Sequence, residues 1–136
     1  MIIVITGSVA SGKSTLARNL AKKLNADYVD VNKMIVENKL NEDYIKELDT
    51  YEVDVDKLKK ILLKLIKNSK KNLIIDSHLS HYLPKKYVDI CIVCRCDIKV
   101  LKKRLEMRKY SRIKIKENLN SEIFDVCLVE ALEFRH

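Results

Sequence analysis

The sequence begins with a short apolar run over residues 2–5 that leads directly into Gly7-Ser8-Val9-Ala10-Ser11-Gly12-Lys13-Ser14-Thr15. This segment fits the pattern G-x-x-x-x-G-K-[ST], in which a buried strand passes through a glycine-hinged loop into a helix. The backbone N–H groups of such a loop and of the helix N-terminus converge and favour polyphosphate there. Both glycines of the chain occupy the fixed positions of the pattern. The sequence therefore predicts a loop that binds a nucleoside triphosphate.

Two side chains of the loop carry most of its chemistry. The Lys13 ammonium can reach the β- and γ-phosphates of a bound nucleotide, and the Ser14 hydroxyl can ligate Mg²⁺. The expected contacts with ATP are the consecutive residues Ala10, Ser11, Gly12, Lys13, Ser14 and Thr15.

The length and the apolar pattern indicate a single domain. A chain of 136 residues is large enough for one core but leaves little room for a second module. The N-terminal apolar run is too short for a signal peptide, and no stretch approaches the roughly 20 apolar residues of a membrane span. We therefore expect one P-loop domain over residues 1–136, cytoplasmic and without a membrane segment.

The four cysteines are expected to be buried free thiols. Cys91 and Cys94 have the spacing of a zinc or redox pair, but they lie within an apolar strand pattern. Side chains three residues apart on a strand leave opposite faces of the sheet. A second pair that would complete a tetrahedral metal site is also missing from the sequence.

Charge is unevenly distributed along the chain. The formal net charge is +8, whereas residues 42–56 contain seven acidic side chains and one lysine. A basic body with an acidic segment suggests an anionic partner, such as a nucleotide or RNA, and a basic protein partner. A lysine-rich surface of the kind found in heat-adapted proteins is the alternative, and the sequence leaves both open.

Apolar periodicity predicts alternating strands and helices. Continuous apolar runs, typical of strands buried on both faces, occur at 73–76 and 88–94, and a shorter strand is expected at 28–31. Helical spacing of apolar residues occurs at 13–24, 58–66, 98–107 and 119–134. Residues 32–55 are expected to form a mobile or partly helical excursion. The predicted fold is a doubly wound α/β domain with a mainly parallel sheet of five or four strands flanked by helices.

A second group of polar residues follows the strand at 73–76. Asp76 ends this strand, at the position where P-loop proteins place the carboxylate of their Mg²⁺ site. His78, two residues later, can point to the same side and orient a water or a phosphate oxygen, although a structural role is equally compatible with the sequence. His81 is expected at the surface.

Two arginines lie four residues apart on the predicted helix at 98–107 and its end. This spacing places Arg104 and Arg108 on one helix face, just before a basic stretch. Phosphoryl transfer depends on charge neutralisation, and an arginine lowered over the phosphates by a moving segment is a recurring solution. Surface arginines without a role are the alternative.

Three stretches together resemble adenylate kinase and, within that group, its divergent isoenzyme-six branch. They are the phosphate-binding loop, the segment Asp76–Pro84 with its Asp-x-His element, and residues 95–124 with Arg104 and Arg108. The resemblance spans about residues 2–131. It implies an adenylate kinase-like fold with a monophosphate-binding region at about 30–53 and a lid at about 107–117.

The resemblance also implies an activity. This is reversible transfer of the γ-phosphate from ATP to a nucleoside monophosphate, with AMP as the expected acceptor, Mg²⁺ as the cofactor and a side ATPase activity. Lys13, Asp76, His78 and Arg108 would be catalytic, Ser14 and Asp76 would hold the metal, and Arg104 would pack near adenine. The family assists late maturation of the small ribosomal subunit by binding a basic platform ribosomal protein, which gives the acidic 42–56 segment a candidate purpose and makes rRNA contact a further expectation.

The sequence departs from the family at three places. Val36 stands where an arginine that grips the monophosphate is expected, and no arginine occurs between Arg18 and Arg95. Ala10 replaces a frequent glycine, and we expect no terminal helix at the adenine site. Lys33, Lys39 or His78 could substitute for the arginine, but a lysine is a weaker fork for phosphate. Two alternatives therefore stay open: a nucleotide-gated assembly ATPase with little monophosphate kinase activity, and another small-molecule P-loop kinase.

Overall fold

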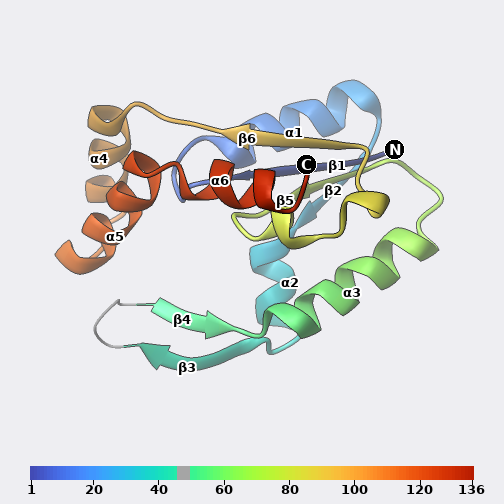
Figure 1. The fold of residues 1–136 in the computed structure, drawn as a ribbon, viewed down its shortest axis with the longest axis horizontal. Coiled ribbons are helices and arrows are strands. Elements are labelled where there is room, and N and C mark those ends of the chain that lie inside the picture. The colour runs from blue at the N-terminus through green and yellow to red at the C-terminus, as the bar shows by residue number, and fades with distance from the viewer. Residues whose placement is uncertain (46–49) are drawn as a thin grey trace.

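A four-stranded parallel sheet forms the centre of the molecule. The computed structural model describes the backbone of residues 1–45 and 50–136, and the side chains outside 41–51. The strand order is β2-β5-β1-β6, and the strands are β1 (Ile2–Gly7), β2 (Asp27–Asp30), β5 (Leu73–Asp76) and β6 (Ile90–Cys94) (Figure 1). β1 and β5 occupy the two central positions because their apolar runs can be buried on both faces. The four-stranded form of the predicted sheet is thus confirmed.

Helices cover both faces of this sheet. The helices are α1 (Lys13–Leu24), α2 (Val31–Glu37), α3 (Val55–Asn68), α4 (Ile98–Met107), α5 (Arg112–Ile123) and α6 (Val126–Glu133), with short 3-10 turns η1 (Ser80–Tyr82) and η2 (Lys85–Tyr87). Of these, α4 and α5 pack against each other at one end of the molecule rather than on a face of the sheet. Val4 faces the core layer shared with α2 and α3, whereas Ile3 and Ile5 face the layer shared with α1. The alternation along β1 thus builds two cores, one on each side of the sheet.

The excursion after β2 is more regular than the sequence indicates. It contains the helix α2 and an antiparallel hairpin of β3 (Asn41–Ile45) and β4 (Thr50–Val53), which projects from the body in Figure 1. The expectation of partial helix is confirmed by α2. The hairpin was missed, because β3 shows no alternation of apolar and polar residues and the alternation in β4 spans only four residues.

The C-terminal helical pattern also divides in two. The apolar spacing over 119–134 predicts one continuous helix, but the chain turns between α5 and α6 at Asp125, which has φ 50°. A positive φ ends a helix, and it is uncommon for any residue other than glycine or asparagine. Because of this break, α6 can pack against β1 and β6 while α5 packs against α4.

The cysteines follow the predicted strand geometry. Cys91 packs against the layer of α2 and α3, and Cys94 packs against the layer of α1, so the two thiols lie on opposite faces. All four are free and half-buried rather than fully buried. Burial raises the pKa of Cys91 to about 11, which makes its thiol unreactive at neutral pH.

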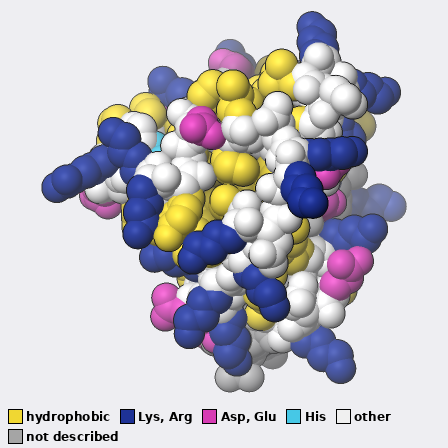
Figure 2. All heavy atoms as spheres, turned by 90° about the vertical axis from the view of Figure 1, so that its right-hand side faces the viewer, with side chains coloured by type: hydrophobic (Ala, Val, Ile, Leu, Met, Phe, Trp, Pro, Cys, Tyr) yellow, Lys and Arg dark blue, Asp and Glu magenta, His cyan; other side chains and the backbone are white. Residues whose placement is uncertain are grey.

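The surface is strongly basic over part of the molecule. On the face shown in Figure 2, Lys and Arg side chains surround a small apolar area and outnumber the acidic side chains. Among the helices of the described residues, none has both the length and the apolar character needed to cross a bilayer.

Candidate active site

The phosphate-binding loop follows β1 as the sequence predicts. Gly7 has φ 147°, and a Cβ at this position would lie 2.6 Å from the carbonyl oxygen of Cys94. Gly12 has φ 96°, and α1 begins at the next residue, Lys13. Both glycines are therefore required by the backbone, the first by close packing as well as by conformation.

A cleft of about 810 Å³ opens over this loop. It is bounded on one side by the loop and the start of α1, and on the other by the end of α4. All six loop residues predicted to contact ATP line it, and so do Arg104 and Arg108. The other residues that line it are Val9, Leu16, Arg18, Asn19, Asn32 and Met107. The structure thus brings the predicted loop contacts and both predicted arginines to one cleft.

The Lys13 side chain is held at the floor of the site. It is 8% exposed, and its Nζ donates a hydrogen bond to the Ser8 carbonyl oxygen at 3.4 Å. Burial lowers the pKa of Lys13, while the negative charge of Asp76 opposes that shift. A buried ammonium beside a carboxylate is a preformed cation for phosphate oxygens.

Asp76 presents one free oxygen to this region. Its Oδ2 accepts a 2.6 Å hydrogen bond from the Tyr28 hydroxyl, whereas its Oδ1 is buried and has no hydrogen-bond partner among the described residues. Burial and the bond to Asp76 raise the pKa of Tyr28 to about 12, so this hydroxyl stays a donor. The Ser11 hydroxyl oxygen is also buried, and it too has no partner in the part of the chain that the structure describes. Unpaired buried polar atoms are costly, and they mark places where a ligand completes the hydrogen bonding.

The residues predicted to hold Mg²⁺ suit that ion. The free Asp76 oxygen and the hydroxyl of the half-buried Ser14 are oxygen ligands of the kind that Mg²⁺ prefers. Among the described residues no cluster of three or more His, Cys, Asp or Glu side chains could hold a metal by itself. Mg²⁺ commonly binds through one or two protein ligands together with substrate phosphates, so the donor set fits.

His78 lies close to the same charges. Burial, the positive charge of Lys13 and the neighbouring His81 lower its pKa to about 4, and Asp76 acts in the opposite direction. The imidazole is therefore neutral at pH 7 and can exchange hydrogen bonds without carrying a charge.

His81 is buried, which corrects the surface position expected from the sequence. It is 1% exposed, its Nδ1 lies 2.8 Å from Thr6 Oγ1, and its Nε2 lies 2.7 Å from Glu130 Oε2. If Nε2–H donates to the carboxylate, Nδ1 accepts from the Thr6 hydroxyl. The imidazole joins β1, η1 and α6, and these partners are too distant in sequence to be inferred from a local pattern.

The two arginines of the α4 region make different contacts. Arg104 Nη1 donates to the Ala10 carbonyl oxygen at 3.1 Å and lies 3.6 Å from Cys96 Sγ. Arg108 Nη1 donates to the Tyr110 hydroxyl at 3.3 Å. Arg104 is thus tied to the loop, while Arg108 is exposed at the edge of the cleft.

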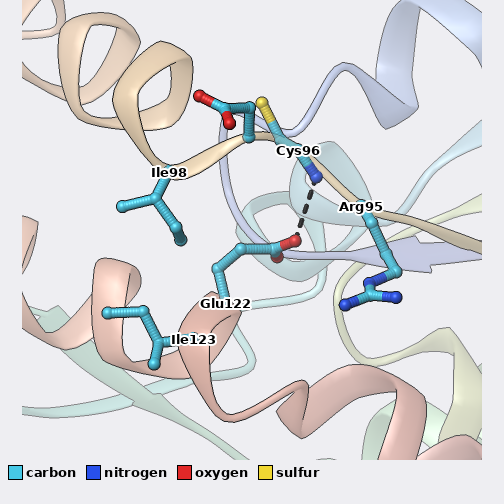
Figure 3. A pocket seen from close by; sticks show the side chains of 6 residues that line it. Arg95, Cys96, Ile98, Glu122 and Ile123 are labelled. Atoms are coloured by element: carbon cyan, nitrogen blue, oxygen red, sulfur yellow. Dashed lines mark hydrogen bonds between the residues drawn. The ribbon is translucent and has the colours of Figure 1, made fainter.

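A second hollow lies beyond the end of β6, beside the loop. It has a volume of about 520 Å³ and is lined by Arg95, Cys96, Asp97, Ile98, Glu122 and Ile123 (Figure 3). Glu122 was not singled out by the sequence as a site residue, yet its carboxylate is buried and bonded to Ser8 of the loop at 2.6 Å.

Comparisons with known proteins agree with this geometry. A family model described as an AAA domain matches residues 3–125. Two relatives, from Methanococcus maripaludis and Pyrococcus furiosus, are named "Putative adenylate kinase". They are 40% and 43% identical, over 98% of this chain and 73% and 69% of their own lengths. The adenylate kinase isoenzyme 6 homolog of Caenorhabditis elegans is 36% identical over 96% of this chain and 72% of its own.

Solved structures support the same fold. Shikimate kinase from Bacteroides thetaiotaomicron superposes with a TM-score of 0.60 and 20% identity, over 99% of this chain and 79% of that one. Deoxyadenosine kinase from M. mycoides superposes with a TM-score of 0.53 and 19% identity, over 99% of this chain and 84% of that one. At these identities the likeness concerns the P-loop kinase fold alone. The sequence relatives carry the assignment further: this chain is a kinase-like enzyme that belongs to the adenylate kinase family, in the branch of isoenzyme 6 and its archaeal relatives.

Proposed function

We propose that this chain transfers the γ-phosphate of ATP to nucleoside monophosphates, with AMP as the expected acceptor, and also hydrolyses ATP when no acceptor is bound. The observation that carries the proposal is a buried lysine that lines the cleft, with a buried carboxylate that has a free oxygen and a neutral histidine close enough to act on its charge. These are Lys13, Asp76 and His78. The names of the archaeal and C. elegans relatives support adenylate as the acceptor.

Each of these side chains has a role in phosphoryl transfer. Lys13 neutralises charge on the β- and γ-phosphates, which the N–H groups of the loop also bind. Ser14 and Asp76 would hold Mg²⁺, which when bound supplies further charge neutralisation on the same phosphates. His78, uncharged at pH 7, orients the attacking oxygen of the acceptor or of water by a hydrogen bond.

The lid at about 107–117 is proposed to close over the nucleotide. It contains the end of α4, a turn through Lys109 with φ 57°, and the beginning of α5. Arg108 lies at the border of the cleft, where a small movement of this segment brings it to the phosphates. Arg104 is proposed to pack near adenine from its position against Ala10.

The acceptor side is built without arginine. In the proposed monophosphate-binding region, about 30–53, Val36 is 67% exposed and Lys33 lies 3.9 Å from Glu37, on the same exposed helix face. A lysine provides only a point charge where arginine provides a two-pronged donor. We therefore propose broad acceptor specificity and a prominent ATPase activity. This arrangement also favours the second candidate, an assembly ATPase with little monophosphate kinase activity.

The test is the rate of ADP formation from ATP and Mg²⁺, first alone and then with AMP, CMP or dAMP. Acceleration by a monophosphate, with formation of the matching diphosphate, is the expected result. If the rate of ADP formation is the same with and without every monophosphate, the kinase proposal fails and the assembly ATPase is supported instead. Absence of ADP in every mixture, including shikimate-like and nucleoside acceptors, would contradict both.

We further propose that the chain assists maturation of the small ribosomal subunit in the cytoplasm through a basic platform ribosomal protein, with contact to rRNA. The acidic segment at 42–56 is the candidate surface for that protein. Glu47 and Asp49 of this segment lie outside the described residues, whereas Glu52 is exposed on β4. Reversing the charges of Glu47, Asp49 and Glu52 should weaken binding to the basic protein at low salt, and unchanged binding would refute this role.

A further inference from the structure

The carboxylate of Glu122 lies at a fork, where the phosphate-binding loop after β1 and the connection from β6 to α4 separate. β1 and β6 pair in parallel as far as Gly7 and Cys94, which form the last register pair. Beyond this pair the first strand continues into the phosphate-binding loop, and the second continues through residues 95–97 into α4. The backbone ladder therefore ends where the loop begins, and another group has to hold the two segments together.

Glu122 bonds to both branches of this fork. Its Oε2 accepts a 2.6 Å hydrogen bond from the Ser8 hydroxyl, and its Oε1 accepts a 2.9 Å hydrogen bond from the Cys96 backbone N–H. Figure 3 shows the side chain reaching from α5 toward the Cys96 backbone, between Ile98 and Ile123 on one side and Arg95 on the other. Hydrogen bonds to an ionised carboxylate are stronger than neutral ones, especially when buried.

Ser8 in turn holds the shape of the phosphate-binding loop. Its carbonyl oxygen accepts hydrogen bonds from the Ser11 backbone N–H at 3.1 Å and from Lys13 Nζ at 3.4 Å. A displacement of Ser8 would therefore move both the turn of the loop and the buried ammonium. Glu122 acts on the phosphate site through one intervening residue.

The helix that carries Glu122 also follows the proposed lid. α5 packs on α4 through a cluster in which Leu119 and Ile115 contact the buried residues Ala10, Leu101 and Leu105. A second tie, the 2.7 Å ion pair of Arg95 and Asp125, fixes the end of α5 to the same β6–α4 connection. Glu122 thus lies between the lid arm and the loop that the lid is proposed to cover.

We propose that Glu122 is a positioning residue of the phosphate-binding loop, acting through Ser8 and linking the loop to the α4–α5 arm. This inference rests on the proposed binding of ATP by that loop. Loss of the carboxylate leaves the Ser8 hydroxyl and the Cys96 N–H unsatisfied, so the loop becomes less well ordered for triphosphate. Misplacing a binding group by about 1 Å can cost up to about a hundredfold in rate, so a measurable loss is expected.

The experiment compares four variants of the full chain by equilibrium titration with MgATP and with inorganic tripolyphosphate. Glu122→Ala and Ser8→Ala should each raise the Kd of both ligands about tenfold, and the double variant should be no weaker than the weaker single one. Glu122→Gln should bind within about threefold of the wild type. Its amide oxygen accepts from Cys96, and its amide nitrogen donates to the Ser8 oxygen. Glu133→Ala, an exposed glutamate of α6, is the matched control with unchanged affinity.

Several outcomes would overturn the proposal. Wild-type affinity in folded Glu122→Ala and Ser8→Ala would do so, as would a Glu122→Gln variant as weak as Glu122→Ala. If Glu122→Ala does not fold by circular dichroism, Ser8→Ala decides alone, because it removes a single hydroxyl. Failure of the wild-type protein to bind either ligand would instead refute the proposed function, so the two failures are distinguishable.

Discussion

At the scale of single residues, two buried opposite charges from different elements lie near each other beside the phosphate-binding loop. Lys13 follows the loop after β1, and Asp76 ends β5, where it pairs in register with Ile5. Each charge reduces the cost of burying the other, and the opposing effects on the pKa of Lys13 reflect this. The pair is therefore a feature of the folded protein before any nucleotide binds.

Removing the Lys13 ammonium should abolish turnover while leaving the fold intact. Lys13→Ala is expected to lower ATP-dependent ADP formation by at least about a hundredfold, the loss typical of a preorganised group that stabilises charge in the transition state. Lys22→Ala, on the exposed surface of the same helix, is the control and should retain full activity. An active Lys13→Ala enzyme would show that the cleft over the loop is not the catalytic site.

The Tyr28 hydroxyl is expected to contribute to stability through Asp76. Tyr28→Phe removes the only hydrogen bond that the Asp76 carboxylate makes among the described residues, so the free energy of unfolding should fall by about 1–2 kcal/mol. Tyr87→Phe is the control. The face of the Tyr87 ring lies near the Lys67 and Lys86 ammonium groups, and phenylalanine keeps this face. Urea unfolding at pH 7 measures both, and equal stabilities would mean that solvent replaces the bond without cost.

His78 should make the protein less stable in mild acid. Its pKa is about 4 in the folded protein and about 6.5 when unfolded, so below pH 6.5 the unfolded chain takes up a proton that the native chain does not. Stability is therefore complete above pH 6.5 and is lost as the pH falls toward 4. The unfolding free energy of the wild type relative to His78→Gln should decrease by about 2 kcal/mol between pH 7.5 and 4.5. A pH-independent difference would contradict the shifted pKa.

At the scale of secondary-structure elements, local patterns determine most of the frame. β1, the loop and α1 were predicted with nearly correct bounds, because an apolar run, two glycines and a helical stripe all lie within about 25 residues. β2 and β6 were placed within two residues. The β3–β4 hairpin and the break at Asp125 were not predicted. The only alternation in the hairpin strands is the four residues of β4, and neither place has a glycine or a proline to mark it.

Within the site, the sequence indicated the position of residues that belong to the loop, to a strand end or to one helix face, and their roles stay predictions. The loop contacts and the two arginines line the cleft, and Asp76 ends its strand as expected. The buried His81 and Glu122 were missed because their partners are remote. Thr6 is 75 positions from His81, and Ser8 is 114 positions from Glu122. Contacts of this kind come from the packing of the C-terminal helices on the sheet, which no local pattern specifies.

Helix α3 depends on a cap that belongs to the acidic segment. Asp54 accepts a hydrogen bond from the Lys57 backbone N–H at 3.0 Å, so Asp54→Ala should lower the free energy of unfolding by about 1 kcal/mol. Asp56→Ala, two residues later in the first turn of α3 and exposed, should lower it much less. Thermal unfolding of the two variants measures the difference. Equal losses of stability in the two variants would indicate that negative charge near the helix N-terminus, rather than the cap, stabilises α3. Charge-reversal variants of the acidic 42–56 segment should keep Asp54 unchanged, so that they do not also remove this cap.

At the scale of the whole molecule, the site lies where four separate parts of the chain meet. The loop after β1 and the end of α4 border the cleft, the end of α5 supports the loop through Glu122, and the end of β5 places Asp76 near Lys13. The carboxyl ends of parallel strands gather at one edge of the sheet, so a doubly wound fold brings these parts together by topology. A ligand that contacts several of these parts at once should stabilise the whole domain against unfolding.

Nucleotide binding should therefore stabilise the entire fold. A ligand that binds only the native state at 100 times its Kd adds about 2.7 kcal/mol to the free energy of unfolding, which for a domain of this size corresponds to a rise in Tm of about 10 °C. MgATP should produce this rise in the wild type by differential scanning fluorimetry, and Lys13→Ala should remove most of it. AMP alone should give a smaller rise, because its acceptor side lacks arginine. A larger rise in Tm with AMP than with MgATP would contradict this expectation, because it would mean that the protein binds AMP more tightly than MgATP.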